Sequence, residues 1–567
     1  RVYHWAARAS DGLDTSGLSA ECEFIVDNGG PTTPPVVSST DYPSDGNYHG
    51  GLGVTGRFTF AANGAPDVAK YRYWWEGKPY QEVATPSLSA TVTVPITPPY
   101  PDIARTLDDV TVAGPRVLHV ASVDPVGHVG PDTSYSILVG SAPGMTHHWR
   151  LDDPAGTTSF ADSVGGASAT RFGSYTRTTG WGDGGSSHTF APGASTATSG
   201  GMVDATKSFT VSAWVQLTSK ADWRAAVTQD GNRVSSFWLQ YRIDTDRFAF
   251  VRPNSDVDNA PLTLALSSQS PQLGAWTLLT GVYDAGAQRI YLYVNGSLAS
   301  SASFTTPWTA AMSLRMGIGK WNGGFGNSLS GGLDDVRTWQ RALDRREIAA
   351  LASAQVGRWD LDWTGEDSSG FGHELIPAGT AGFDFVGNDP ADAGSALLDG
   401  VPGSSFGTDP AAGPVVRTDQ SFSVSAWVNL SATGADAVVA SQDGTYRAGF
   451  SLQYAQAYGT WAFATASADS SGPVGFQAAR ASTAVQVGRW YHLVGVYDAN
   501  ARTLKLYVDG VLAPFTGTSV SLWNATGALR LGQAMGGAWL SGNVDDVRVY
   551  AGVLTPESIA MIDDGQL

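Results

Sequence analysis

Two adjacent aspartates begin the same apolar segment at two places in the sequence. Asp334 and Asp335 lie near the middle of the chain, and Asp545 and Asp546 lie near its end. Successive side chains of a β-strand point to opposite faces, so the two carboxylates of each pair should point apart. One of them could then bind a cation while the other pairs with the arginine two residues further on. This spacing does not suit the paired carboxylates of a glycosidase.

Other aspartates could contribute to the same cation sites. Each double-aspartate segment is preceded, far upstream, by an opening strand with two further aspartates. Calcium prefers hard oxygen ligands from several carboxylates and backbone carbonyls. The alternative is that these residues only make turns and ion pairs. The candidate metal ligands are Asp152, Asp162, Asp334, Asp362, Asp367 and Asp545.

Aromatic residues supply the second candidate chemistry, because carbohydrate binding needs flat rings and planar polar groups in a groove or loop cluster. Trp321 and Trp539 shortly precede the two double-aspartate segments, so aromatic and cation sites could be adjacent. For each ring the alternative is a core or loop-anchoring role. The candidate ligand-binding residues are Trp181, Trp223, Trp321, Phe325, Tyr446, Tyr458, Trp461 and Trp539. Trp214, Tyr291 and Tyr293 are expected on an exposed strand face.

Catalytic chemistry finds little support. No glutamate lies in the middle of a predicted strand of the repeated segments, where a glycosidase would place its acid. The sequence contains no Gly-x-Ser-x-Gly, P-loop or His-Glu-x-x-His motif. His147, His148 and His373 are expected to be solvated or linker histidines. The sequence therefore predicts a protein without enzymatic activity.

Composition limits the class of protein further. The 567 residues carry a formal net charge of −18, with 15% charged and 11% aromatic residues. No stripe of Lys and Arg could neutralise phosphates, which argues against nucleic-acid binding. No apolar run is long enough for membrane insertion. The single cysteine, Cys22, excludes an intrachain disulfide and is expected to be buried or half-buried. This composition is typical of secreted or cell-surface all-β proteins.

A repeat of about 210 residues accounts for most of the chain. Phe209–Val215 matches Phe422–Val428, and in both segments apolar residues alternate with others, as in a strand with one face in a core. Asn295-Gly296 and the matching Asp509-Gly510 are tight-turn dipeptides of β-hairpins. Each copy ends, after the double-aspartate segment, in a short segment with helix-capping signals.

The residues before the repeat have their own strand signals. Strands are predicted near residues 56–60, 68–75 and 89–94, followed by a closing hairpin, and Trp74 or Trp75 should lie in the core. A similar hairpin opens the chain. The predicted organisation is the end of a truncated immunoglobulin-like module (1–27), a linker (28–35), an immunoglobulin-like sandwich (36–140) and two jelly rolls (145–353 and 354–567).

The ordered motifs Phe-x-Val-x-Ala-Trp-Val, Gly-Val-Tyr-Asp, Tyr-Val-Asn/Asp-Gly and Leu/Val-Asp-Asp-Val-Arg occur in both copies. In this they resemble laminin G-like domains, which are concanavalin A-like jelly rolls. The resemblance implies neighbouring first and last strands and a structural Ca²⁺ at the sandwich rim. It points to Asp162 with Asp334, and Asp367 with Asp545, as calcium ligands. Residues 36–140 resemble immunoglobulin-like or fibronectin-type modules of bacterial surface proteins.

These features favour a non-catalytic extracellular binding or adhesion protein, with a glycan or an extracellular protein as partner. The second hypothesis is an architectural spacer or assembly module of a larger secreted or surface particle. The third is a divergent glycosidase. Because the chain begins at Arg1 without a Met or signal peptide, it is expected to be a processed form or a fragment of a larger polypeptide.

Overall fold

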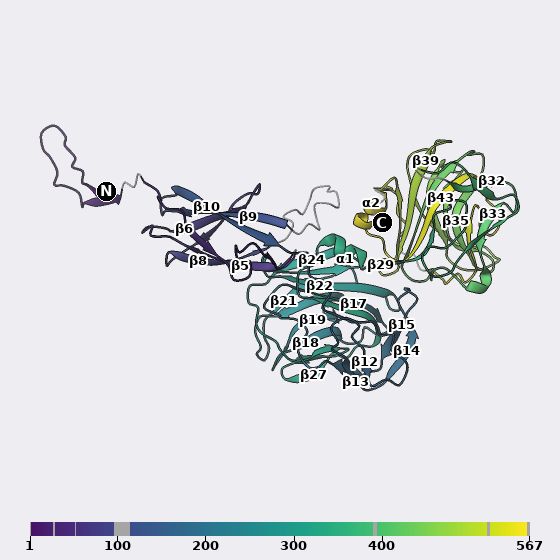
Figure 1. The fold of residues 1–567 in the computed structure, drawn as a ribbon, viewed down its shortest axis with the longest axis horizontal. Helices are drawn as coiled ribbons and strands as arrows, with labels where there is room; N and C mark the ends of the chain where they lie inside the picture. The colour runs from purple at the N-terminus through teal and green to yellow at the C-terminus, as the bar shows by residue number, and fades with distance from the viewer. Residues whose placement is uncertain are drawn as a thin grey trace. The chain divides into compact units, whose positions relative to one another are not determined.

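The structure is a computed structural model that describes residues 2–25, 29–51, 53–95, 114–388, 394–518 and 522–563. Its regular elements are almost all strands, so the predicted all-β class is confirmed (Figure 1). The chain divides into two compact units, Arg1–Pro143 and Gly144–Leu567, and each is described by itself. Across the described ranges, neither α-helix has the length and apolar character needed to cross a membrane.

The first unit begins with an antiparallel hairpin of β1 (Val2–Trp5) and β2 (Cys22–Ile25). This is the hairpin predicted from the sequence, and Tyr3 stacks on Phe24 with 5.4 Å between the ring centroids. Cys22 is exposed, so the expectation of a buried or half-buried thiol is wrong. The physical reason is that a two-stranded sheet without a second layer has no core to bury a side chain.

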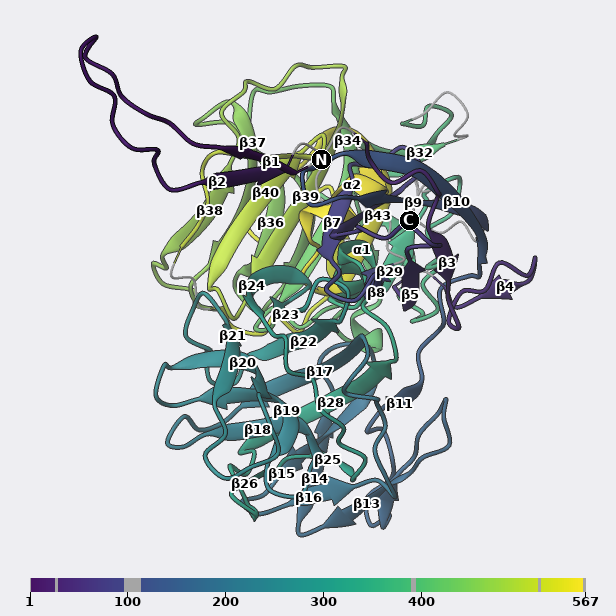
Figure 2. The ribbon, with the colours of Figure 1, turned by 90° about the vertical axis from the view of Figure 1, so that its left-hand side faces the viewer.

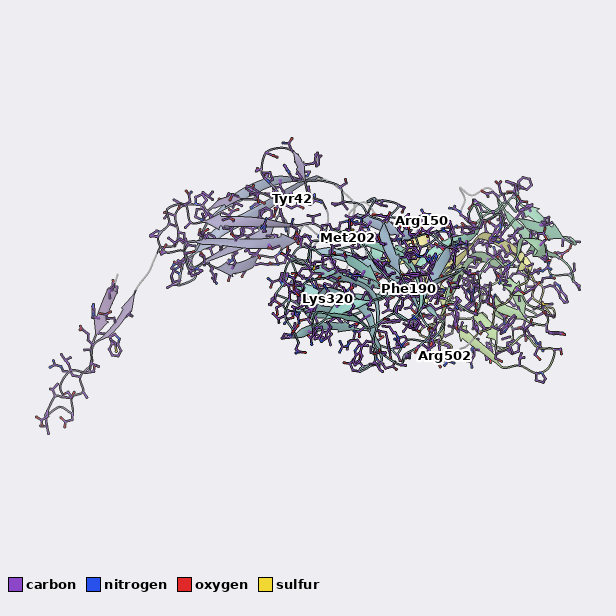
Figure 3. All side chains as sticks on the ribbon, turned by 90° about the horizontal axis from the view of Figure 1, so that it is seen from below. Tyr42, Arg150, Phe190, Met202, Lys320 and Arg502 are labelled. Atoms are coloured by element: carbon purple, nitrogen blue, oxygen red, sulfur yellow. The ribbon has the colours of Figure 1, made fainter. Side chains whose placement is uncertain are left out.

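The rest of the first unit is a sandwich of a three-stranded and a five-stranded sheet around one core. Tyr42, labelled in Figure 3, is fully buried in it. Trp75 packs against this core, whereas Trp74 stacks on His119, as side-chain alternation along a strand requires. That the sandwich is immunoglobulin-like stays a prediction. Its strands are β3 (Val36–Ser38), β4 (Tyr48–His49), β5 (Thr55–Ala61), β6 (Lys70–Trp75), β7 (Gln81–Ala84), β8 (Ser89–Pro95), β9 (Gly114–Val123) and β10 (Val129–Val139).

In the second unit, the first copy of the repeat is a jelly roll with two main sheets. The larger sheet contains β11 (His147–Trp149), β14 (Tyr175–Thr179), β15 (Ser186–Phe190), β17 (Phe209–Leu217), β22 (Trp276–Asp284), β23 (Arg289–Val294), β24 (Ser297–Ser303) and β28 (Gly331–Trp339). The smaller sheet contains β18 (Arg224–Asp230), β19 (Ser235–Arg242), β20 (Arg247–Pro253), β21 (Leu262–Leu266) and β25 (Leu314–Met316). Beside them lie β12 (Ser159–Phe160), β13 (Ala169–Phe172) and β16 (Ser195–Ala197), and the hairpin of β26 (Gly319–Trp321) and β27 (Gly324–Gly326).

The second copy repeats this arrangement. One sheet contains β29 (Ser353–Trp359), β31 (Gly382–Asp384), β32 (Ser395–Asp399), β34 (Phe422–Leu430), β39 (Trp490–Asp498), β40 (Thr503–Val508), β41 (Val511–Leu512) and β43 (Ser541–Gly552). The other contains β30 (Leu375–Ala378), β33 (Ser405–Thr408), β35 (Ala437–Asp443), β36 (Ala448–Ala455), β37 (Thr460–Ala466), β38 (Phe476–Arg480) and β42 (Leu529–Leu531). The opening strands β11 and β29 pair with the closing strands β28 and β43, as the resemblance implied.

Side-chain alternation positions the core of each jelly roll. On β17, Phe209, Val211, Ala213 and Val215 all lie in one buried cluster, together with Phe190, which is labelled in Figure 3. The hairpins turn where the dipeptides predicted: Asn295 and Gly296 have φ of 47° and 76°. Asp509 and Gly510 have φ of 50° and 73°. Two successive positive φ values are what a tight hairpin turn needs.

The opposite face of the larger sheet is covered, contrary to the expectation that Trp214, Tyr291 and Tyr293 are exposed. Trp214 is 1% and Tyr293 is 7% exposed, and Tyr291 is half-buried. The reason is a second packing layer. The tail of the first copy, with α1 (Arg345–Ala350), folds back over Tyr293, and α2 (Pro556–Asp563) covers the matching face of the second copy. The two helices contact each other, as Figure 2 shows.

The two jelly rolls also share a buried core. Trp181 and Trp214 of the first copy stack with 4.0 Å between ring centroids and belong to the same buried cluster as the core of the second copy. Gln420 of the second copy accepts the Trp276 N–H at 3.0 Å and donates to the Gly274 carbonyl at 3.2 Å. The two copies therefore pack as one body within the second unit.

Candidate functional site

A β-bulge interrupts each closing strand at the double aspartate. In β28 the register against β17 shifts between Ser212 and Trp214, and β43 shifts in the same way against β34. The second aspartate of each pair has a left-handed backbone, with φ of 53° at Asp335 and 40° at Asp546. A bulge sets two residues opposite one, so simple alternation does not hold there. The expectation that Asp334 and Asp335 point to opposite faces is therefore wrong: both are buried and repel each other electrostatically.

The second aspartate of each pair makes an ion pair, which was the alternative left open by the sequence. Asp546 accepts two hydrogen bonds from Arg548, each of 2.9 Å. Asp335 pairs with Arg337 and also with His148. Burial acts to raise the pKa of Asp335, but the bond from His148 and the charge of Arg337 outweigh it and lower that pKa. His148 and His373 are buried, so the expectation of solvated histidines is wrong for these two.

The first aspartate lies in a less favourable environment in the first copy. The backbone N–H of Trp181 donates to Asp334 at 3.3 Å. Burial, together with the negative charges of Asp183, Asp335 and Asp152, raises the pKa of Asp334 well above its usual value. Burial and the charges of Asp335 and Asp152 also raise the pKa of Asp183. Asp152 lines a polar hollow of about 750 Å³ together with Arg177 and Ser186. In the second copy the matching Asp545 accepts the Asn388 N–H at 2.9 Å.

Asp162 and Asp367, the predicted calcium partners of these residues, have structural roles. Asp162 accepts the backbone N–H groups of His148, Val164, Gly165 and Ala167 and a bond from the His147 ring. Asp367 accepts the N–H groups of Arg358, Ser369 and His373. Burial acts to raise both pKa values, but these bonds outweigh it and lower them.

The predicted calcium sets are not assembled. Asp162 and Asp367 already accept several N–H donors each, and Asp362 is exposed. Within the described ranges, no three His, Cys, Asp or Glu side chains are placed to hold a metal ion. Calcium binding therefore stays a prediction from that resemblance.

The predicted aromatic residues are spread over different environments. Trp181 and Trp461 are buried, with 4% and 1% exposure, and offer no ring to a ligand from solvent. Tyr458 is exposed but stacks against Arg480 at 3.8 Å. The other candidates lie at the surface: Trp223, Trp321 and Trp539 are half-buried, and Phe325 and Tyr446 are about half exposed. Of the eight, only Trp539 is among the residues that line the groove described next.

The second jelly roll has a groove of about 500 Å³ on the outer face of its β35–β36–β37 sheet. Strands β36 and β37 are labelled in Figure 2. The floor consists of small side chains, among them Ser451 and Ala464, which alternate with the core residues Phe450, Leu452 and Phe463. The groove is bounded by Trp539 and Met535 from the loop after β42 and by Phe476 of β38. Polar groups come from Gln453, Arg447 and Asp436.

The first jelly roll fills the same face with its own side chains. Trp238 stands at the position of Ser451, and Val251 at that of Ala464, each directly after a phenylalanine that both copies share. Trp238 is 3% exposed and packs in one cluster with Val251 and Trp321. The β26–β27 hairpin that carries Trp321 occupies residues 318–328, whereas the corresponding loop of the second copy is only 533–539. The groove thus exists because small residues and a shorter loop replace large ones.

Sequence reasoning found Trp539 but missed Arg447, Ser451 and Gln453. A groove floor is built from small residues, which carry no chemical signal of their own. The available signal was the difference between the copies, since Trp238 in one aligns with Ser451 in the other.

With this geometry in place, comparison with known families identifies the class of protein. The model of the Laminin_G_3 family, described as the concanavalin A-like lectin/glucanases superfamily, matches residues 183–349 and 406–560, which is more than half of the chain. The chain therefore belongs to this family, and the predicted laminin G-like resemblance of both copies is confirmed.

Some solved structures are similar to this chain at low sequence identity. Domain 4 of AbnA, an extracellular GH43 arabinanase from Geobacillus stearothermophilus in complex with arabinotriose, is 21% identical, with a TM-score of 0.31 over 37% of this chain and 99% of that chain. Domains LG4-5 of the mouse laminin alpha1 chain are 12% identical, with a TM-score of 0.20 over 60% of this chain and 82% of that one. Comparison with curated proteins gives no match.

Proposed function

We propose that the chain is a non-catalytic extracellular protein that binds a glycan in the groove of the second jelly roll. The observation that carries this proposal is the open groove of about 500 Å³ on a face that the first jelly roll fills with its own tryptophans. Small-molecule sites usually occupy roughly 300–1,000 Å³. Membership of a superfamily that contains lectins supports the same conclusion.

The lining of the groove matches the two sides of a sugar. A pyranose ring has an apolar C–H face, which can pack on the half-exposed ring of Trp539. Its hydroxyls need donors and acceptors. The Ser451 hydroxyl and the Gln453 amide line the groove and have no hydrogen-bond partner within the described ranges. The Asp436 carboxylate, which is exposed, can accept further hydroxyl protons.

The first jelly roll indicates a substitution that should fill the groove of the second. Ser451→Trp introduces the side chain that the first copy carries at Trp238, and it should weaken binding by at least about tenfold because the ring fills the space of the sugar. Trp539→Ala should weaken binding through loss of the stacking surface. A glycan array, followed by calorimetry on the strongest ligand, measures both.

The matched control is Val511→Trp, which adds the same ring to an exposed strand of the same jelly roll outside the groove. Its binding should equal that of the wild type, and thermal melting should show that all variants are folded. Array signals that persist in Ser451→Trp and Trp539→Ala would contradict a site in this groove.

Binding without turnover is part of the proposal. Glycoside hydrolysis uses two positioned carboxylates, and Asp436 is the single carboxylate among the residues that line the groove. Incubation of the pure protein with polysaccharides, followed by analysis of reducing ends, tests this point. New reducing ends would show that the protein is an enzyme.

A purely architectural role is the alternative, and the buried core shared by the two jelly rolls favours it. Such rigid packing suits a spacer or assembly module as well as a binding protein. No array signal from the wild type, together with self-association that Trp539→Ala abolishes, would favour this role over glycan binding.

A further inference from the structure

The two ends of the groove differ in charge. Arg447 lies in the turn between β35 and β36, whereas Asp436 immediately precedes β35 at the opposite end. At about 3.3 Å per residue, the seven residues of β35 separate these ends by roughly 20 Å. Trp539 lies at the Asp436 end, because the neighbouring Ala538 accepts a hydrogen bond from Val438. Phe476 lies at the Arg447 end, since it pairs with Ala466, the last residue of β37.

The guanidinium of Arg447 is fixed in place but not neutralised. Its Nε donates to the Ser470 carbonyl and its Nη2 to the Gly472 carbonyl, both at 3.1 Å. These two bonds use the N–H groups on the Nε side of the planar guanidinium. The N–H groups of Nη1 and Nη2 that point away from the side chain stay available to a ligand. No carboxylate within the described ranges forms an ion pair with this residue. The nearby Asp469 instead accepts the backbone N–H groups of the turn, including that of Arg447 at 3.0 Å.

Other arginines around this sheet are occupied. Arg530 pairs with Asp443 at 2.9 Å, and Arg480 stacks between the rings of Tyr458 and Phe515. In the first copy the position of Arg447 is held by Val234, beside the filled face. The open groove therefore has a fixed arginine without an ion pair at a position where the filled face of the first copy has an aliphatic residue. Because the chain has a net charge of −18, Arg447 does not belong to a generally basic surface, and an anion would be attracted to this position in particular.

We infer that the groove selects an acidic glycan, with an anionic group of one sugar at Arg447 and a neutral sugar ring on Trp539. This inference rests on the proposed glycan-binding function. The free edge of the guanidinium offers two parallel N–H donors, which match the two oxygens of a carboxylate and can also bind a sulfate. The carboxylate of Asp436 repels an anion at the other end, so the glycan binds in one direction.

The experiment compares ligand pairs that differ only in charge. Oligogalacturonides and their methyl esters form the carboxylate pair, and sulfated and desulfated carrageenan oligosaccharides form the sulfate pair. Calorimetry with the full chain should show roughly ten- to hundredfold tighter binding of the acidic member of one pair, the range expected for charge-assisted hydrogen bonds. The pair that shows this preference identifies the anionic group.

Arg447→Gln should abolish the preference, so that the acidic and neutral members of the pair bind with equal affinity, and Arg447→Lys should restore only part of it. Arg489→Gln is the matched control, because it removes a charge from an exposed ion pair of the same jelly roll outside the groove. Equal affinity of the wild type for both members of each pair, or an unchanged preference in Arg447→Gln, would overturn the inference. A wild type that binds neutral glycans, with loss of binding in Ser451→Trp, would leave the proposed function intact, whereas no glycan binding at all would refute both.

Discussion

At the residue scale, Asp334 lies among three other carboxylates and receives one hydrogen bond, from the Trp181 N–H, within the described ranges. Its pKa is raised in the folded state, so the folded protein binds the proton more tightly than the unfolded chain does. Stability must then fall as pH rises from the unfolded pKa of about 3.9 towards the raised folded value.

Asp334→Asn removes the buried charge and keeps an oxygen for the Trp181 N–H. It should raise the thermal midpoint at pH 7.5 and raise it less, or not at all, at pH 4. Asp335→Asn is the opposite case, because the pKa of Asp335 is lowered by His148 and Arg337 against the effect of burial. That variant should be less stable than the wild type at pH 7.5. Melting curves across this pH range measure both, and a Asp334→Asn variant that is destabilised at neutral pH would contradict the argument.

At the element scale, α1 is short and depends on its cap. Asp344 accepts the backbone N–H groups of Arg346 and Glu347, and Glu347 reaches back to the Asp344 N–H. An isolated six-residue helix is not stable in water, so the cap and the packing of Ile348 hold it against the sheet.

Asp344→Ala should lower the free energy of unfolding by about 0.5–2 kcal/mol, as the loss of an N-cap usually does. Asp344→Asn keeps the acceptor and should cost less. Chemical denaturation followed by circular dichroism measures the difference, and equal losses in the two variants would mean that charge, not capping, is the relevant property of Asp344.

The elements also show what the sequence could and could not predict. Alternation along Phe209–Gln216 correctly placed the core residues of β17, because burial of one face is encoded locally in each strand. It failed for Trp214, whose face is covered by residues far away in sequence. It also failed at Asp335, because a bulge is set by the pairing of two strands. The groove was not predictable from one copy alone, since small side chains form it.

At the scale of the whole molecule, the two jelly rolls share buried tryptophans and should unfold together. Trp181 is 4% exposed and stacks on Trp214 within the cluster that includes the core of the second copy. Trp181→Ala should therefore lower the stability of both copies, by about 3–5 kcal/mol, the usual cost of removing a large buried aromatic side chain.

Calorimetry of the full chain should show one transition for both jelly rolls, and this transition should move as a whole in Trp181→Ala. The control Trp223→Ala removes a half-buried ring outside this cluster and should have a small effect. Two separate transitions, with only one of them shifted in Trp181→Ala, would show that the copies are thermally independent.

The filled face of the first jelly roll has a consequence for valency. A tandem repeat with two open grooves would engage two sugars of one surface at once, and the second contact would multiply the affinity through its high effective concentration. Trp238 and Trp321 occupy that face in the first copy, and only the second copy has the groove proposed for glycans. Under the proposed function, one chain would hold one glycan strand at a time through this groove. Avidity would have to come from several chains side by side rather than from the duplication within one.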